Sequence, residues 1–349
     1  MLVHDQLLAK RGIALPDQNP MKQAILKHKT RLKAEYIRAQ IKMKKEDNGA
    51  KKKVRWFRIN PIQWKEDDKL LLNQLLNGWT ESKDLNLNGN FFYKDTIVPH
   101  LYGIPLEHTS HLTSSIFYTR GEIILQDKAS CFPILLLDPK PGEEFIDACS
   151  APGNKTTHLA SVLREGKVYA IERDQSRFKE LNKMVAKAGA SNSLVETVHG
   201  DFLSIDPQDD AFKRVRGIVL DPSCSGSGLD SHGGEAGDDT NSNVDPVRLE
   251  KLSNFQSHML DHALKFTNVR RVVYSTCSVH AEENERVVEK ALERNKGWRL
   301  LQRNEQGPLQ SWPIRGIEGG NEIADSVIRA NLGDNHSTIG FFVAAFVRN

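Results

Sequence analysis

From about Gly121 onward, short apolar runs alternate with amphipathic stretches of helical periodicity. The apolar runs that we expect to form strands are residues 144–148, 167–172, 195–199, 216–221, 271–275 and 339–347, and the expected helices are 155–164, 176–188, 247–266 and 281–295. This alternation predicts an α/β fold with a doubly wound, mostly parallel, Rossmann-like sheet. Ligands of such sheets bind beyond the carboxyl ends of the strands, so the residues that follow each strand are the first candidates for a site.

The sequence before and within this region suggests further divisions. Residues 54–118 mix strand and helix patterns, including a helical stretch at 67–76, and predict a small α+β module; residues 119–349 form the larger domain. Residues 1–53 read as a basic helical arm. Residues 225–245 are rich in Gly, Ser, Asp and Asn, which predicts a mobile loop.

The net charge of +3 conceals an uneven distribution. Residues 1–60 carry 16 Lys and Arg against 5 Asp and Glu, whereas the remainder carries 32 against 40. One interpretation is a solvated helix that keeps the protein soluble. We favour the other, contact with a nucleic acid backbone, because the basic excess lies beside Trp56 and Phe57.

Composition excludes several other classes. The mean hydropathy is -0.49 and no run of about 18 uncharged apolar residues occurs, which argues against a membrane span. The first ten residues lack the apolar region of a signal peptide, so we do not expect secretion. The four cysteines lie 18, 75 and 53 positions apart, without the close pairs of a zinc knuckle, and we expect no metal.

The turn after the first expected strand is a candidate cofactor site. It reads DACSAPGNKT at 147–156 and lacks the contiguous Gly-Lys-Thr of a phosphate loop and the three glycines of a dinucleotide fingerprint. Acidic residues end this strand and the next two: Asp147, Glu172 and Asp201. Each alone is commonly a strand-end cap, but three together fit a nucleoside ligand without a pyrophosphate, as in S-adenosylmethionine.

Two cysteines follow the next two strands, Cys224 in a Pro-Ser-Cys-Ser turn and Cys277 in Ser-Thr-Cys-Ser. A single cysteine in such a place is usually a buried small hydrophobe. Because both follow apolar strands and lie beside the expected cofactor, we interpret them as reactive thiols facing one crevice.

These motifs give the chain a specific resemblance. It resembles RNA cytosine-5 methyltransferases of the Sun/Fmu (RsmB-like) family from about residue 54 to the C-terminus. The matching segments are QDKAS at 126–130, CSAPGNKT at 149–156, DPSCSGSG at 221–228, YSTCS at 274–278 and ENE at 283–285. The DPSCSGSG form, Gly-Asn-Lys in place of Gly-Gly-Lys, and GFFVA at 340–344 are similar to the eukaryotic branch that methylates large-subunit ribosomal RNA.

The resemblance implies S-adenosylmethionine-dependent methylation of carbon 5 of cytosine through a covalent cysteine adduct. It implies that Cys277 attacks carbon 6, that Cys224 serves product release, that Asp221 contacts the cytosine edge and that Lys155 tunes a thiol or orients the base. The residues implied to bind the cofactor are Asp147, Cys149, Ala151, Pro152, Gly153, Asn154, Lys155, Glu172, Arg177, Asp201 and Asp221.

Other expectations follow from the same resemblance. The partner is RNA, as free RNA or in a pre-ribosomal particle, the chain is a monomer, and it resides in the nucleus and nucleolus. For Phe202 and Phe132 we favour a core role over the alternative of lining a base pocket. Two alternatives stay open: a non-catalytic RNA-binding assembly factor, and a DNA cytosine methyltransferase in which Cys224 is the attacking thiol.

Overall fold

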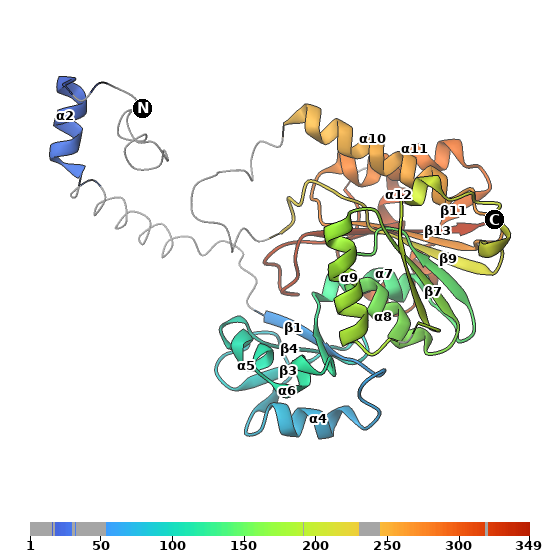
Figure 1. Cartoon of the computed structure of the whole chain (residues 1–349), viewed down its shortest axis with the longest axis horizontal. Coiled ribbons are helices and arrows are strands. Elements are labelled where there is room, and N and C mark those ends of the chain that lie inside the picture. Colours follow the sequence, from blue (N-terminus) through green and yellow to red (C-terminus); the bar gives the residue numbers. More distant parts are fainter. Residues whose placement is uncertain are drawn as a thin grey trace. The chain divides into compact units, whose positions relative to one another are not determined.

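We describe a computed structural model of the chain, in which residues 16, 18–29, 32, 54–190, 192–229, 245–317 and 320–349 are described (Figure 1). The chain divides into two units, one of residues 1–51 and 231–242 and one of residues 52–230 and 243–349. In the first unit, α2 (Pro20–Lys27) begins at the Asn19 cap, whose side chain accepts from Met21 N. The rest of the predicted arm (1–53) and residues 230–244 of the predicted mobile loop lie outside the described residues.

The second unit contains an eight-stranded sheet in the order β11-β13-β10-β9-β6-β7-β8, with β12 paired to β13. Its strands are β6 (Glu144–Asp147), β7 (Lys167–Glu172), β8 (Val195–His199), β9 (Val215–Leu220), β10 (Arg271–Thr276), β11 (Trp298–Leu300), β12 (Ile328–Ala330) and β13 (Phe341–Arg348). The central strands β10, β9, β6, β7 and β8 are parallel, and β13 runs antiparallel to β10. The predicted doubly wound, mostly parallel sheet is thus confirmed.

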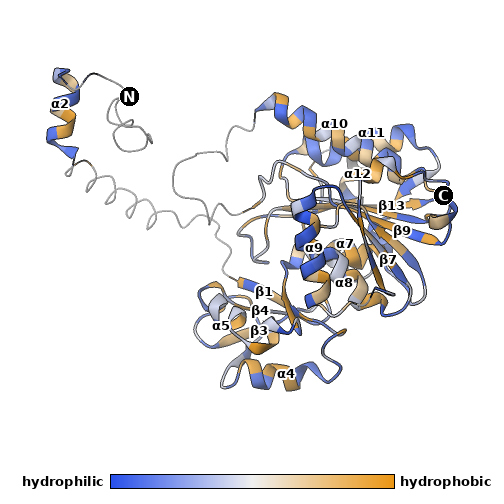
Figure 2. Ribbon diagram, in the orientation of Figure 1, coloured by the Kyte–Doolittle hydropathy of each residue, from blue (hydrophilic) through white to orange (hydrophobic). Residues whose placement is uncertain are grey.

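Helices cover both faces of this sheet. They are α7 (Lys128–Leu137), α8 (Asn154–Leu163), α9 (Gln175–Lys187), α10 (Pro246–Ala263), α11 (Glu285–Arg294) and α12 (Gly320–Ser326). Two separate apolar clusters result: Val273 packs with α7 and α8, while its neighbours Val272 and Tyr274 pack with α10 and α11. Figure 2 shows apolar residues concentrated on the strands, and both hydrophilic and hydrophobic residues on α10. Within the described residues, no helix combines the length and apolarity that crossing a bilayer requires.

The six expected strands correspond to β6, β7, β8, β9, β10 and β13, but α7 was not expected from the sequence. This helix is buried on nearly every side and contains Pro133. Its side chains therefore show no amphipathic period, and proline normally argues against a helix interior. β11 and β12, of three residues each, are too short for a pattern to reveal them.

The residues before α7 form a second sheet in the order β2-β3-β4-β1-β5. Its elements are β1 (Val54–Ile59), β2 (Thr80–Ser82), β3 (Phe91–Lys94), β4 (Leu101–Pro105) and β5 (Ile123–Leu125), with α4 (Asp68–Leu75), α5 (Thr109–Thr113) and α6 (Ile116–Thr119). The sheet therefore extends beyond Tyr118 into β5. Six short 3-10 helices complete the described elements: η1 (Leu106–His108), η2 (Phe202–Ser204), η3 (Asp210–Phe212), η4 (Ala281–Glu283), η5 (Arg303–Glu305) and η6 (Gly307–Ser311).

A buried lysine joins the two sheets. Lys128, at the start of α7, lies 2.5 Å from the Asp95 carboxylate, and its ammonium is 5.5 Å and 5.3 Å from the ring centroids of Trp56 and Trp312. A buried charge requires a partner of this kind, because desolvation would otherwise disfavour it. The QDKAS motif thus serves to dock the module on the larger domain.

Gly228 connects the loop after β9 to the loop after β10. Its N–H donates to Cys277 O over 2.9 Å, and its own carbonyl accepts from Gly340 N over 2.8 Å. A Cβ at Gly228 would overlap the backbone of Gly340, which has no flexible end that could move aside. The close approach requires glycine at both positions.

We therefore predict that Gly228→Ala lowers the free energy of unfolding by about 1–3 kcal/mol, as expected for an overpacked site. Gly297→Ala is the control, because nothing lies within 4 Å of a Cβ there. Urea denaturation measures both variants. Equal free energies of unfolding for Gly228→Ala and Gly297→Ala would contradict the close contact between Gly228 and Gly340.

Candidate active site

The turn that follows β6 places the start of α8 against the ends of the neighbouring strands. Gly153 caps α8 with a φ of 111°, a value that favours glycine, and a Cβ there would press on Met184. The Ser150 hydroxyl donates to Ile171 O over 2.8 Å, and Ala151 N donates to the Glu172 carboxylate over 3.3 Å. The turn is thus fixed to the end of β7.

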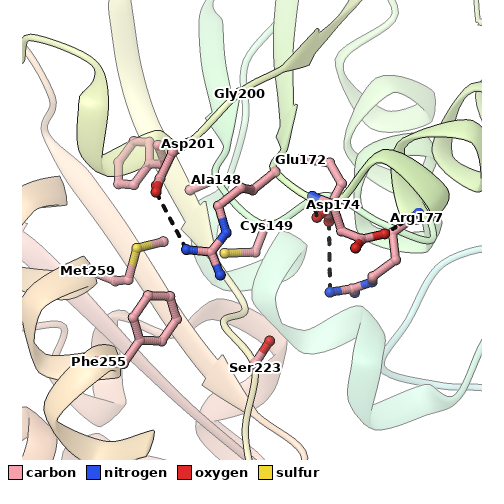
Figure 3. Close-up of a pocket in the computed structure, with 12 residues that line it drawn as sticks. Ala148, Cys149, Glu172, Asp174, Arg177, Gly200, Asp201, Ser223, Phe255 and Met259 are labelled. Atoms are coloured by element: carbon pink, nitrogen blue, oxygen red, sulfur yellow. Dashed lines mark hydrogen bonds and ion pairs between the residues drawn. The ribbon is translucent and has the colours of Figure 1, made fainter.

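A pocket of about 270 Å³ opens beside this turn (Figure 3). It is lined by Ala148, Cys149, Glu172, Arg173, Asp174, Arg177, Gly200, Asp201, Phe202, Ser223, Phe255 and Met259. The carboxylates of Glu172 and Asp201 come from the ends of β7 and β8, and apolar side chains of α10 form the facing wall. Carboxylates accept hydrogen bonds from ribose hydroxyls and amino groups, whereas apolar and aromatic walls suit a purine, so the pocket fits an adenosyl group.

Four of the predicted cofactor residues line this pocket: Cys149, Glu172, Arg177 and Asp201. Arg177 also donates to Ala151 O over 2.7 Å, which ties the turn to α9. The other turn residues, Pro152, Gly153 and Asn154, lead from the pocket into α8.

Asp147 lies beneath the turn rather than in the pocket wall. It is buried and accepts from the Thr156 hydroxyl over 2.7 Å. Desolvation by burial raises the pKa of Asp147 to about 6, against the lowering effects of that hydrogen bond and of Lys155. Asp147 therefore stabilises the turn through its hydrogen bond with Thr156.

Arg173, Phe255 and Met259 line the pocket but were not expected from the sequence. Arg173 lies 3.5 Å from Asp201. Phe255 and Met259 are four residues apart on α10, which places them on one face of the helix. That spacing is the same whether a helix faces a core or a ligand, so the sequence offered no specific signal.

Phe132 and Phe202, for which we favour a core role over a place in the base pocket, have different surroundings. Phe132 is buried in α7, with its ring centroid 4.8 Å from that of Trp312. Phe202 is almost fully buried, stacks on Phe266 at 5.7 Å and contributes to the wall of the adenosyl-sized pocket.

The two predicted reactive cysteines lie together. Because β9 and β10 pair in parallel, the loops after them meet at one edge of the sheet, and the sulfur atoms of Cys224 and Cys277 are 3.1 Å apart. Both cysteines are free and partly buried. Cys131 is fully buried in the core instead.

The shared hydrogen bond makes the two thiols unequal. It lowers the pKa of Cys277 and raises that of Cys224, which corresponds to a Cys224 thiol donating to a Cys277 thiolate. Burial and the charge of Asp221 oppose the lowering at Cys277, and the charge of Lys155 assists it. Of the two sulfurs, Cys277 is the one at which the charge of Lys155 favours the thiolate.

Lys155 and Asp221 form an ion pair next to the thiols. The Lys155 ammonium donates to Asp221 Oδ2 over 2.6 Å, and the Ser275 hydroxyl donates to Asp221 Oδ1 over 2.6 Å. Burial alone would lower the pKa of Lys155, but the charge and hydrogen bond of Asp221 outweigh it, so the pKa is raised. The pair presents one fixed cation and one fixed anion beside Cys277.

Comparisons with known proteins identify the family. Residues 134–347 match the family described as 16S rRNA methyltransferase RsmB/F. The chain belongs to this family. It is 41% identical to the 25S rRNA (cytosine-C(5))-methyltransferase of Schizosaccharomyces pombe, over 99% of this chain and 75% of that protein. It is 37% identical to a 28S rRNA (cytosine-C(5))-methyltransferase of Mus musculus, over all of this chain and 76% of that protein.

Solved structures agree with this assignment. A methyltransferase homologue from Pyrococcus horikoshii has a TM-score of 0.66 and 25% identity, and the match covers 85% of this chain and 87% of the other. The RsmB/F-family chain is a methyltransferase, and S-adenosylmethionine is its methyl donor, as the motifs predict. The pocket lined by the carboxylates of Glu172, Asp174 and Asp201 fits this cofactor.

The unequal thiols lead to a prediction. In the protein without RNA, iodoacetamide should label Cys277 first, with a rate that rises with pH through a midpoint below the ordinary 9.0, because only the thiolate reacts. Cys224→Ala should move the midpoint upward, since it removes the lowering hydrogen bond. Peptide mass spectrometry measures the labelling, with buried Cys131 as the unreactive internal control. Preferential labelling of Cys224 would contradict the assignment.

Proposed function

We propose that this RsmB/F-family enzyme methylates carbon 5 of a cytosine in large-subunit ribosomal RNA. The observation that carries the proposal is the pair of thiols 3.1 Å apart beside the cofactor pocket. The substrate class is supported by the names of the relatives in Schizosaccharomyces pombe and Mus musculus, both large-subunit rRNA (cytosine-C(5))-methyltransferases.

The chemistry of cytosine explains why a thiolate is needed. Carbon 5 is a weak nucleophile, so in our proposal the Cys277 thiolate adds to carbon 6 and forms a carbon–sulfur bond, which makes the ring an enamine. Asp221 stabilises positive charge on the protonated ring nitrogen, and Lys155 holds that carboxylate in place over 2.6 Å. S-adenosylmethionine, when bound, supplies the electrophilic methyl group.

Release requires that the proton on carbon 5 leaves. In our proposal Cys224 first gives its own proton to solvent and, as a thiolate, takes the proton from carbon 5. The electron pair of the carbon–hydrogen bond restores the ring double bond, and the Cys277 sulfur departs as a thiolate. The pKa of Cys224 is raised first of all by its hydrogen bond to Cys277. Once the Cys277 sulfur is bonded to carbon its negative charge is gone, so Cys224 becomes easier to ionise at the step that needs a base.

The proposal extends to RNA contacts and location. The module of residues 54–118 and the basic arm of residues 1–53 would contact RNA, and most of the arm lies outside the described residues. The positive charge of the arm is suited to binding phosphates. Binding of this kind weakens as the salt concentration rises. In this proposal the enzyme is a monomer that acts on free RNA or on pre-ribosomal particles in the nucleus and nucleolus.

The thiol assignment is tested by single substitutions. Cys277→Ala should abolish transfer of a radiolabelled methyl group to large-subunit rRNA from cells that lack the protein, because in our proposal Cys277 supplies the thiolate that adds to carbon 6. Cys131→Ala, in the core, should retain transfer after correction for folded protein. Undiminished methylation by Cys277→Ala would refute the mechanism. If Cys224→Ala alone abolished formation of the covalent adduct, the DNA-methyltransferase scheme would be favoured instead.

The cofactor site gives a second test. Glu172→Gln should raise the Kd for S-adenosylmethionine about 10-fold or more, since a hydrogen bond to a charged group contributes about 1.5–3 kcal/mol. Isothermal titration calorimetry measures the Kd without RNA. Glu293→Gln, on the exposed side of α11, is the control and should bind normally. An unchanged Kd for Glu172→Gln would place the cofactor elsewhere.

A further inference from the structure

Glu283 and Gln256 hold the residues on both sides of Cys224. The Glu283 carboxylate accepts from Ser225 N over 2.9 Å, and the Gln256 amide donates to Ser223 O over 3.0 Å. The same Gln256 amide donates to Glu283 over 2.9 Å, which closes the arrangement. Both side chains are fully buried, so water is excluded from the hydrogen bond between them. Cys224 is thus clamped through its two neighbours.

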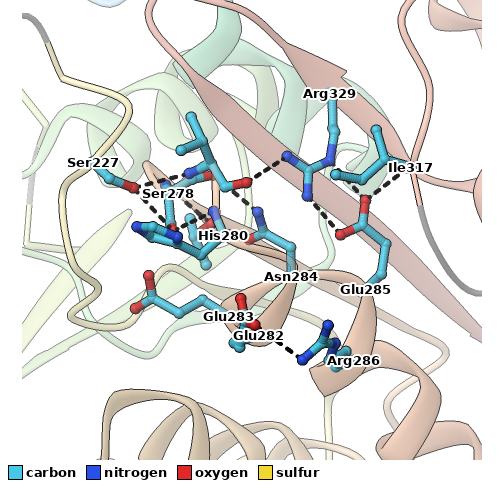
Figure 4. A network of polar contacts seen from close by, with 12 residues as sticks. Ser227, Ser278, His280, Glu282, Glu283, Asn284, Glu285, Arg286, Ile317 and Arg329 are labelled. Atoms are coloured by element: carbon cyan, nitrogen blue, oxygen red, sulfur yellow. Dashed lines mark hydrogen bonds and ion pairs between the residues drawn. The ribbon is translucent and has the colours of Figure 1, made fainter. Parts of the chain in front are cut away.

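Asn284 holds the residues on both sides of Cys277. Its amide oxygen accepts from the Thr276 hydroxyl over 2.6 Å, and its amide nitrogen donates to Ser278 O over 2.9 Å. Asn284 is fully buried, and Figure 4 shows it between Ser278 and Glu285. Two consecutive residues therefore clamp the two cysteines, one each.

The segment that carries these clamps is itself fixed on both sides. The Tyr274 hydroxyl donates to Glu283 O over 2.5 Å. Arg329 of β12 forms a buried two-pronged ion pair with Glu285, at 2.7 and 2.6 Å, and donates to Val279 O over 3.0 Å (Figure 4). A bidentate pair of this type fixes orientation as well as distance.

Thiol chemistry depends on this positioning. The loops after β9 and β10 are rich in serine and glycine, residues that leave a backbone many conformations. Each sulfur must approach a different carbon of one ring, and a misplacement of about 1 Å can slow a reaction about 100-fold. The clamps restrict each loop at the residues directly before and after its cysteine.

We propose that Glu283 and Asn284 are positioning residues with separate duties: Asn284 sets the Cys277 sulfur for attack, and Glu283, through Gln256, sets the Cys224 sulfur for release. This inference rests on the proposed function for the duty of each cysteine. The ENE motif thereby gains a role that its sequence alone did not suggest. Neither side chain touches the cysteine sulfur, so each acts through the backbone of the residues beside it.

The two clamps predict opposite kinetic defects. Asn284→Ala should slow formation of the covalent enzyme–RNA adduct about 10-fold to 100-fold, so that little adduct is present at steady state. At a pH above the Cys277 midpoint of every variant, where Cys277 is a thiolate in all of them, Glu283→Ala should form the adduct at close to the normal rate and resolve it at least 10-fold more slowly, so that adduct accumulates. Rapid quench with large-subunit rRNA, followed by denaturing gels, measures both rates. Equal slowing of both steps in both variants would overturn the proposal.

Matched variants separate positioning from general loss of structure. Glu282→Ala removes a partly exposed ion pair to Arg286 on the same turn and should behave as wild type. Glu283→Gln keeps an oxygen that accepts from Ser225 N and should restore normal adduct resolution. Asn284→Asp keeps the acceptor for Thr276 but loses the donor to Ser278, so it should still slow attack even if the alanine variant does not fold. Wild-type behaviour of Asn284→Asp would count against the clamp.

A readout without RNA distinguishes failure of this inference from failure of the proposed function. Loss of either clamp should raise the midpoint of Cys277 alkylation by iodoacetamide, because the Cys224 hydrogen bond is no longer aligned, whereas Glu282→Ala should leave it unchanged. Unchanged midpoints in both alanine variants would overturn the inference even if the enzyme methylates rRNA. Shifted midpoints together with a wild-type enzyme inactive on rRNA would support the clamps and refute the substrate.

Discussion

The pairing of β9 with β10 is the constraint on which the active site depends. The two strands run parallel in register from Arg271 opposite Gly217 to Tyr274 opposite Leu220. Parallel strands end at the same edge, so two cysteines that are 53 residues apart in the sequence arrive 3.1 Å apart in space. The Gly228 N–H donates to Cys277 O over 2.9 Å, which joins the two cysteine loops directly.

Electrostatics give the paired thiols different characters. The Cys224 hydrogen bond and the Lys155 charge favour a thiolate at Cys277, whereas Asp221 and burial oppose it. Because Lys155 and Asp221 are themselves paired at 2.6 Å, their opposite effects on the thiols partly cancel. The hydrogen bond between the sulfurs favours a thiolate on one of the two cysteines, and its geometry depends on how the loops are held.

The sequence was informative where a pattern is local or a motif is specific. Periodicity located the main strands, and the motifs around Cys224 and Cys277 identified the family. It failed at α7, where burial on all sides removes the period and Pro133 argues against a helix. It also missed Phe255 and Met259, because a helix face that borders a ligand has the same spacing as one that borders a core. The link from Glu283 to Ser225 spans 58 residues, and only the folded chain reveals it.

The central claim is that Cys277 attacks the cytosine while Cys224 faces the same ring. It is tested most directly by incubating Cys224→Ala with large-subunit rRNA and S-adenosylmethionine, digesting the trapped covalent complex and locating the nucleotide-bearing peptide by mass spectrometry. The account predicts a nucleotide attached to the peptide that contains Cys277. A nucleotide on any other residue would contradict it.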